Sequence, residues 1–431
     1  MRDFLPDDVR RRQYVIDVVR RVYERYGFEP LETPALENIE TLTGKYGEEG
    51  NQLIFKVLKR GEGESSGVAD LALRYDLTVP LARVVAEHRG KLPKFFKRYQ
   101  IQPVWRADRP ARGRFREFYQ CDVDTIGSTS PVVEAEMIAA VSEVLQALGF
   151  EDFTVQVNHR EFLRMLLSDA GIPESRHGDA LIAIDKLDKI GADGVVADMA
   201  ARGLSQESAR AALENIEGAV DTLFAESSGW STHPDGTATA AAENLLRIFT
   251  LCEATAARGH VKFTPRLARG LSYYTGAIME IVVPDLPGSL GGGGRYDGLI
   301  GMFSGEPIPA CGFSLGLERI LVVMGERGMF PPDVQASGPD VLVTLFDAPS
   351  IPDSLRLAGE LRGEGLRVEI YPEADKLGKQ FKYASARNAA YVTILGADER
   401  ARGEVTIKNM KTGDQTSVGR EYAAQRIRTE R

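Results

Sequence analysis

The sequence is poor in cysteine and has no long apolar segment. Its three cysteines, Cys121, Cys252 and Cys311, lie far apart among 431 residues and show no C-x-x-C spacing. So few cysteines predict neither a disulfide framework nor a zinc site. No run approaches the roughly 18 apolar residues of a membrane-spanning helix, and the N-terminus has no basic segment leading into an apolar one. These absences predict a cytoplasmic protein with no membrane segment.

Two common nucleotide-binding fingerprints are also missing. The chain has no G-x-x-x-x-G-K-[ST] loop, and residues 291–298 fail the G-x-G-x-x-G spacing because the third position falls on Tyr296 or Asp297. The glycines of this stretch permit positive φ and a close approach of backbone to a ligand, or simply a flexible loop. If the chain binds ATP, arginines such as Arg106 and Arg319 would therefore hold the phosphates.

Basic charge is concentrated in two segments of an otherwise acidic chain. The formal net charge is -9, yet ten Lys or Arg residues face one acidic residue between Arg89 and Arg116. From Lys376 to the end, twelve basic residues face six acidic ones. Either segment alone is equally well explained as a solvated basic face. The two together favour a polyanionic partner such as RNA.

Length predicts two or three domains, and the pattern along the chain indicates two. A chain of 431 residues with 43% hydrophobic content exceeds one compact domain. Residues 1–329 are typical of an α+β domain built on an antiparallel sheet with flanking helices, with a helical insertion at about 165–255. Prolines and glycine at 330–339 predict a linker. Residues 340–431 alternate strand and helix signals, which predicts a small α/β domain.

A strand with one polar face lies in the middle of the first domain. Residues 98–107 and 116–126 predict an antiparallel hairpin around an arginine-rich loop. Period-two spacing places Gln120, Asp122 and Asp124 on the same face of the second strand. A solvent-exposed sheet face is the simpler interpretation. Beside Arg106, which could hold two phosphate oxygens, the carboxylates favour a site for a zwitterionic substrate.

Several segments together resemble the motifs of class II aminoacyl-tRNA synthetases, and of the histidyl-tRNA synthetase family in particular. Residues 104–124 resemble the second class motif, 312–319 (GFSLGLER) the third and, weakly, 27–34 the first. The peptides RGLSYYTG (269–276) and GGRYDGL (293–299) are similar to the two histidyl signature peptides. The resemblance implies that ATP activates L-histidine to histidyl-adenylate, which is transferred to the 3′ end of tRNA(His), and that the protein is a homodimer.

For ATP, the resemblance implies roles for three arginines. Arg106 would grip the α-phosphate, Arg319 would contact the γ-phosphate and the adenine, and Arg269 would contact the carboxylate and the α-phosphate as they react. Mg²⁺ would accompany the phosphates. Ser272 stands where the family commonly has Asp, so any role that needs a carboxylate there is in doubt.

For histidine, the resemblance implies a set of pocket residues. The α-amino group would be held by Asp76, Thr78 and Gln120. The two imidazole nitrogens would be bonded by Asp124 and Tyr274. Tyr273 and Tyr296 would line the pocket, although paired tyrosines are more often part of a core. A carboxylate and a phenol do complement the donor and the acceptor that imidazole offers.

The C-terminal segments 376–387 and 403–410 resemble an anticodon-binding domain, which their basic charge suits. Two alternatives remain at this point. One is a non-catalytic, histidine-binding regulatory paralogue of ATP phosphoribosyltransferase, but such proteins generally lack this domain and have eroded signature peptides. The other is a class II synthetase for a different amino acid, against which the tyrosine peptides argue.

Overall fold

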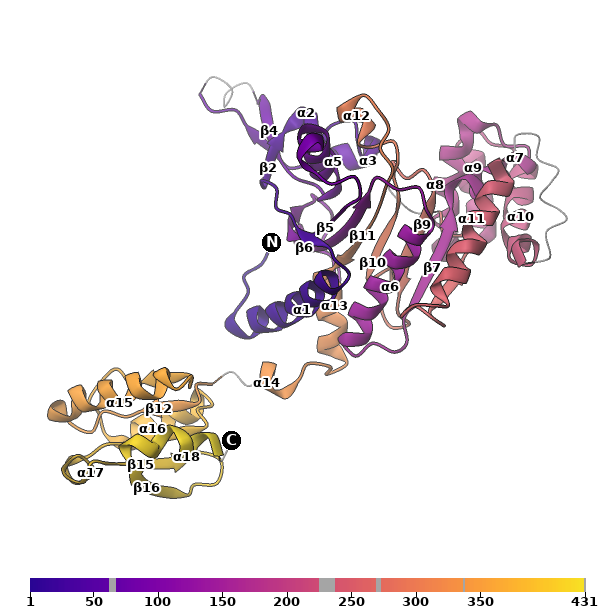
Figure 1. The fold of residues 1–431 in the computed structure, drawn as a ribbon. Coiled ribbons are helices and arrows are strands. Elements are labelled where there is room, and N and C mark those ends of the chain that lie inside the picture. The colour runs from indigo at the N-terminus through magenta and orange to yellow at the C-terminus, as the bar shows by residue number, and fades with distance from the viewer. Residues whose placement is uncertain (62–66, 225–236, 269–272, 336–337, 430–431) are drawn as a thin grey trace. The chain divides into compact units, whose positions relative to one another are not determined.

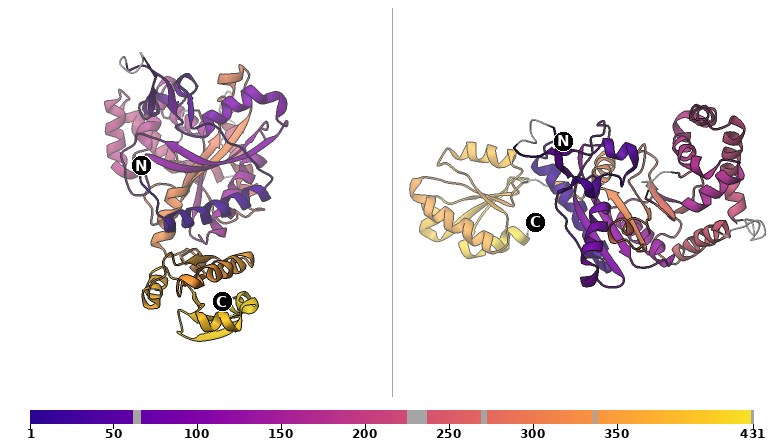
Figure 2. Two further views of the ribbon diagram at one scale, coloured as in Figure 1. Left: turned by 90° about the vertical axis from the view of Figure 1, so that its left-hand side faces the viewer. Right: turned by 90° about the horizontal axis from the view of Figure 1, so that it is seen from above.

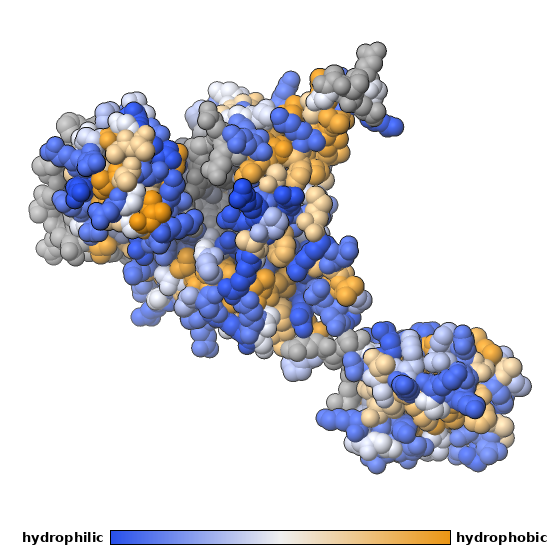
Figure 3. Space-filling view, turned by 180° about the vertical axis from the view of Figure 1, so that it is seen from behind, coloured by the Kyte–Doolittle hydropathy of each residue, from blue (hydrophilic) through white to orange (hydrophobic). Residues whose placement is uncertain are grey.

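A computed structural model of the chain describes residues 1–61, 67–224, 237–268, 273–335 and 338–429. They form two compact units (Figure 1), one of Met1–Asp3 and Arg12–Met329, the other of Phe4–Arg11 and Phe330–Arg431. Within the described ranges, no helix combines the length and the apolar character that a membrane crossing requires. Seen from behind, each unit exposes mostly hydrophilic residues, and smaller clusters of apolar residues lie among them (Figure 3).

An eight-stranded sheet forms the centre of the first unit. In spatial order its strands are β1 (Glu29–Pro30), β5 (Phe96–Trp105), β6 (Glu117–Ile126), β11 (Ala310–Gly316), β10 (Gly291–Arg295), β9 (Ala277–Val282), β7 (Thr154–His159) and β8 (Val261–Phe263). The two edge pairs, β1–β5 and β7–β8, are parallel, and the inner pairs are antiparallel. The predicted class, an antiparallel sheet with flanking helices, is confirmed.

Helices cover this sheet and extend beyond one of its edges. The helices α1 (Pro6–Arg25), α6 (Val132–Ala147) and α13 (Leu317–Glu326) pack against it, and the apolar stripe of α1 is buried. Beside β7 lie the helices of the insertion (Figure 2). They are α7 (Arg160–Asp169), α8 (His177–Ile184), α9 (Leu187–Ala201), α10 (Gln206–Phe224) and α11 (Thr237–Cys252).

A smaller layer, built mainly from residues 36–88, lies against the large sheet. It contains the antiparallel sheet β2 (Leu36–Asn38), β4 (Ala69–Leu73) and β3 (Lys56–Leu58), and the helices α2 (Ile39–Leu42), α3 (Gly47–Gln52), α5 (Thr78–His88) and α12 (Gly301–Ser304). Its core joins Tyr46 and Tyr75 to Tyr273 and Tyr296, which come from the two signature peptides. Segments far apart in the sequence therefore meet around these tyrosines.

The second unit is a mixed α/β sheet. Its strand order is β13 (Val368–Ile370), β12 (Val341–Val343), β14 (Tyr391–Ile394), β15 (Glu404–Asn409) and β16 (Gln415–Gly419). The first three strands are parallel to one another, β15 is antiparallel to β14, and β16 is antiparallel to β15. The helices are α14 (Pro332–Gln335), α15 (Ile351–Gly363), α16 (Leu377–Ala386), α17 (Ala397–Arg402) and α18 (Ala423–Thr429). The predicted α/β class is confirmed.

One expectation is wrong: the glycines at 291–294 form a central strand, β10, and not a loop with positive φ. Glycine is disfavoured in strands, which is why sequence reasoning missed it. The packing supplies the reason for glycine here. A Cβ at Gly293 would overlap the carbonyl oxygen of Gly312 and come within 2.7 Å of the Phe313 Cα, both on the neighbouring strand β11.

Candidate active site

A cavity of about 500 Å³ lies over strands β6, β11, β10 and β9, within the size range of small-molecule sites. Gly291, Gly292 and Gly293 of strand β10 line it, and because they have no side chains a ligand can approach the sheet backbone closely there. Seven of the predicted site residues line it: Asp76, Thr78, Arg106, Gln120, Tyr273, Tyr274 and Arg319. Arg269 and Ser272 lie outside the described residues.

Arg106 follows directly on β5 and is held between two aromatic rings. Its Cζ lies 4.3 Å from the ring centroid of Tyr75 and 5.1 Å from that of Phe118. The Nε donates to the Tyr75 carbonyl oxygen at 3.1 Å. Neither Nη donates a hydrogen bond to another residue of the described chain, so the fork that suits two phosphate oxygens can serve a ligand.

Arg319 enters the same cavity from the first turn of α13. Its Nη1 donates to the Ser289 carbonyl oxygen. Two glycines give it room, because a Cβ at Gly288 would lie 3.0 Å from this Nη1 and a Cβ at Gly113 would lie 3.2 Å from the Arg319 Cγ. Two of the three arginines predicted to bind ATP, Arg106 and Arg319, thus reach one cavity, from a strand end and from a helix start.

Asp76 is a buried carboxyl group at the cavity wall, 1% exposed. Its Oδ1 accepts hydrogen bonds from the Tyr46 hydroxyl and the Val79 amide, each at 3.0 Å, and its Oδ2 accepts one from the Tyr273 hydroxyl at 3.3 Å. Burial raises the pKa of Asp76, while these donors and the Arg106 charge oppose the rise. A cationic ligand group in the cavity would further favour the carboxylate.

Three tyrosines are packed edge to face beside Asp76. The ring centroids of Tyr273 and Tyr274 are 5.1 Å apart, and those of Tyr273 and Tyr296 are 5.9 Å apart. Gly294 leaves space for Tyr274, since a Cβ there would lie 3.0 Å from its ring. Burial raises the pKa of all three phenols above the ordinary value. The hydroxyls therefore stay protonated and can donate hydrogen bonds.

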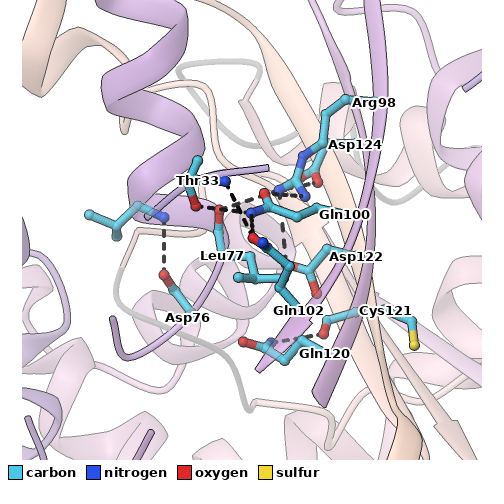
Figure 4. A network of polar contacts seen from close by, with 12 residues as sticks. Thr33, Asp76, Leu77, Arg98, Gln100, Gln102, Gln120, Cys121, Asp122 and Asp124 are labelled. Atoms are coloured by element: carbon cyan, nitrogen blue, oxygen red, sulfur yellow. Dashed lines mark hydrogen bonds and ion pairs between the residues drawn. The ribbon is translucent and has the colours of Figure 1, made fainter. Parts of the chain in front are cut away.

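Asp124 and Tyr296 are not among the residues that line the cavity, and both are buried. Asp124 belongs to a polar network that also contains Arg98 and Asp122 (Figure 4). Asp124 Oδ1 accepts from the Tyr296 hydroxyl, and Oδ2 lies 2.7 Å from Arg98 Nη2. The same Nη2 lies 3.9 Å from Asp122 Oδ2. Burial raises the pKa of Asp122 to about 7 and also raises that of Asp124, while Arg98 opposes both shifts. One guanidinium therefore serves two buried carboxyl groups.

Sequence reasoning missed several residues at or near the site. Arg98 could have been found, because in the predicted hairpin it pairs directly across from Asp124. Ser314, which lines the cavity from β11, lies within the third motif but drew no attention. Lys189 comes from α9 and is the one lining residue from the described part of the insertion. Its position depends on how the insertion folds back, for which the sequence holds no local signal.

A cavity on an antiparallel sheet that is lined by arginine side chains, here Arg106 and Arg319, is the arrangement of class II aminoacyl-tRNA synthetases. A family model described as histidyl-tRNA synthetase matches residues 1–320, and one described as anticodon binding domain matches residues 341–430. The chain belongs to the histidyl-tRNA synthetase family.

Similar proteins agree along the whole chain. A protein of Gloeobacter violaceus named histidine--tRNA ligase is 42% identical, over 99% of this chain and 97% of the relative. One of the same name from Porphyromonas gingivalis is also 42% identical, over 96% and 95%. The crystal structure of histidyl-tRNA synthetase from Nostoc sp. PCC 7120 superposes with a TM-score of 0.82 at 30% identity, over 100% and 98%. The regulatory paralogue is therefore not favoured.

Proposed function

We propose that this chain activates L-histidine with ATP and transfers the product to the 3′ end of tRNA(His). Family membership supports this reaction. The observation that carries it is that Arg106 and Arg319, which suit phosphates, share one cavity with Asp76 and Gln120, which suit an ammonium group. A cavity with both kinds of group suits an amino acid placed next to a nucleotide.

Histidine would lie against the tyrosines with its α-ammonium group toward Asp76, Thr78 and Gln120. The Tyr274 phenol lines the cavity and can bond one imidazole nitrogen. The predicted bond from Asp124 to the other nitrogen requires the ligand to reach below the cavity lining, where Tyr296 and Arg98 already contact that carboxylate. A pocket that pairs both nitrogens would reject apolar analogues strongly.

In the first step, a carboxylate oxygen of histidine would attack the α-phosphorus of ATP in line. A bond from this oxygen to phosphorus forms, the bond to the bridging oxygen breaks, and pyrophosphate leaves with the electron pair. Arg106 would orient the α-phosphate and balance its growing negative charge. We assign the same task to Arg269. In the second step, the terminal tRNA hydroxyl takes the histidyl group and AMP leaves.

Magnesium would enter with the ATP phosphates. Among the described residues, no group of three or more His, Cys, Asp or Glu side chains could hold a metal ion. Mg²⁺ bound to a nucleotide needs only one or two protein carboxylates, because phosphates and water complete its shell. Asp108 and Glu280 are among the residues that line the cavity, and their carboxylates would supply these ligands. The ion would neutralise charge on the phosphates.

The second unit would bind the tRNA anticodon. Its exposed lysines Lys376, Lys379 and Lys382 lie on or next to α16, where they could contact backbone phosphates. We also propose a homodimer, as the family resemblance implies, which a molar mass of twice 47.3 kDa in solution would test. The cytoplasmic location stays a prediction from the sequence.

The deciding experiment is amino-acid-dependent exchange of pyrophosphate into ATP with the full chain and Mg²⁺. We expect exchange with histidine alone among the twenty amino acids. Exchange with a different amino acid would overturn the specificity. Histidine binding without any exchange would revive the regulatory paralogue.

A further inference from the structure

We infer that Ser314 is a positioning residue, which holds the side-chain amide of Gln120 with its oxygen toward the α-ammonium group of the substrate. The inference rests on the proposed function, because that function assigns ammonium recognition to Gln120. It adds one residue, which the sequence motifs do not assign to histidine.

The geometry comes from two neighbouring strands. Gln120 lies on β6 and Ser314 on β11, where Ser314 pairs with Asp122 and Gly316 with Gln120. The Gln120 Nε2 donates to the Ser314 Oγ at 2.8 Å. Both residues line the cavity. The Gln120 Oε1 is buried and has no hydrogen-bond partner among the described residues. Buried acceptors are nearly always paired, so this oxygen is suited to a donor on a ligand.

The contacts of the amide give its orientation. Its Nε2 faces the Ser314 hydroxyl, which accepts this hydrogen bond, so the oxygen lies on the other side of the amide group. In the opposite orientation, Oε1 would face Ser314 and the NH2 group would take the place of the acceptor.

The consequence for the substrate is a matched set of acceptors. An α-ammonium group has three protons to donate and accepts none. The residues Asp76, Thr78 and Gln120 all line the cavity, and each has a side-chain oxygen that can accept. A rotated Gln120 amide would present NH2 to the ammonium group, which is repulsive. By holding the amide in this orientation, Ser314 therefore favours ligands that carry a free amino group.

The test is the variant Ser314→Ala with three probes. Histidine and histidinol carry the amino group, whereas imidazolepropionate lacks it and keeps the carboxylate and the ring. We expect the Kd of histidine and of histidinol to rise about tenfold, which is the size of a lost hydrogen bond to a charged group, and that of imidazolepropionate to stay unchanged. Equal weakening of all three probes, or no weakening, would overturn the inference.

Two further variants separate positioning from damage to the fold. Thr125→Val removes a buried β6 hydroxyl that has no partner among the described residues, so all three Kd values should match the unmodified protein. In Gln120→Glu, both carboxylate oxygens accept, so adding Ser314→Ala should change the Kd of histidine less than twofold. A persisting tenfold effect in that background would count against the inference. If the unmodified chain shows no histidine-dependent exchange, the proposed function itself fails.

Discussion

Arg98 and Asp124 face each other across the β5–β6 hairpin with Nη2 2.7 Å from Oδ2, and neither side chain reaches solvent. Their exposed fractions are 0% and 3%. Because Asp124 also accepts from Tyr296, and Arg98 also lies near Asp122, this pair connects the polar strand β6 to the tyrosine core. Its removal would leave two buried carboxyl groups without a cation.

We therefore expect Arg98→Met to lower the free energy of unfolding by about 3–5 kcal/mol, the usual loss when one partner of a buried ion pair is removed. The matched control is Arg89→Ala, which breaks an exposed ion pair with Glu306 of ordinary length, 2.8 Å. That change should cost below about 1 kcal/mol. Urea unfolding of the full-length variants measures both, and equal losses would mean that Arg98 is not needed to compensate the carboxyl groups.

His159 makes stability depend on pH in the acid range. Burial is the main cause that lowers the pKa of His159 to about 4, and the charge of Arg295 is the second. The His159 Nδ1 accepts a hydrogen bond from the Glu161 amide at the start of α7. The unfolded chain should titrate near 6.5 and so binds this proton first. The stability from the neutral ring is therefore complete above pH 6.5 and is lost as the pH falls toward 4.

His159→Asn tests this dependence, because asparagine can also cap a helix but does not titrate. We expect the Tm of the unmodified protein to fall more steeply than that of the variant between pH 6.5 and pH 4. Thermal unfolding at a series of pH values measures the difference. Parallel curves would show that His159 is not the group responsible.

The hairpin shows how much of the fold the sequence could predict. Its strands were expected at 98–107 and 116–126 and lie at 96–105 and 117–126, because period-two alternation is a local signal. The simpler interpretation of its polar face, exposure to solvent, is wrong, since Asp122 and Asp124 are each 2% exposed when the whole residue is counted. The burial of these carboxyl groups depends on Arg98 and on the smaller layer that lies against the large sheet, and local sequence patterns reveal neither.

The site was predictable where residue chemistry was distinctive and unpredictable where packing decides. Because the sequence has no glycine-rich phosphate-binding loop, Arg106 and Arg319 were predicted to hold the phosphates, and both line the cavity. Ser314 acts through a hydrogen bond to Gln120 on another strand, so no spacing within one segment points to it. Lys189 enters from an inserted helix, and its place depends on contacts between distant segments.

Arg269→Ala should slow adenylate formation about 100- to 1000-fold while changing the Kd of histidine less than about threefold. A group that acts on developing charge affects the transition state more than the bound substrate. Pyrophosphate exchange and equilibrium binding give the two numbers. The control is Arg266→Ala nearby, an exposed residue paired with Asp188, which should leave both unchanged. Equal losses in rate and affinity for Arg269→Ala would refute the role.

Replacing Lys376, Lys379 and Lys382 together by alanine should raise the KM for tRNA about tenfold and leave pyrophosphate exchange intact. The slope of log affinity against log salt should also fall by about one for each lysine that contacts a phosphate. Lys379 forms an exposed pair with Asp375, so its share should be the smallest. If exchange and charging fell together, the second unit would not be a separate tRNA-binding domain.

Gly293→Ala should destabilise the first unit, although alanine usually favours folding over glycine at a site that tolerates it. The new Cβ would lie 2.7 Å from the Phe313 Cα and closer still to the Gly312 carbonyl oxygen. Both atoms are backbone of β11, which is itself paired with β6, so neither can move without displacing the cavity floor. Overpacking of this kind costs about 1–3 kcal/mol.

Gly292→Ala is the control for this change on the same strand. A Cβ at Gly292 would meet the Met279 carbonyl oxygen at 3.4 Å, which is an ordinary contact, and Gly292 does not have a positive φ. The free energy of unfolding of this variant should therefore differ from that of the unmodified protein by less than about 0.5 kcal/mol. Thermal unfolding of both variants gives the comparison. If Gly293→Ala melted at the same temperature as Gly292→Ala, close strand approach would not explain the glycine at 293. The run of glycines would then have to serve the ligand alone.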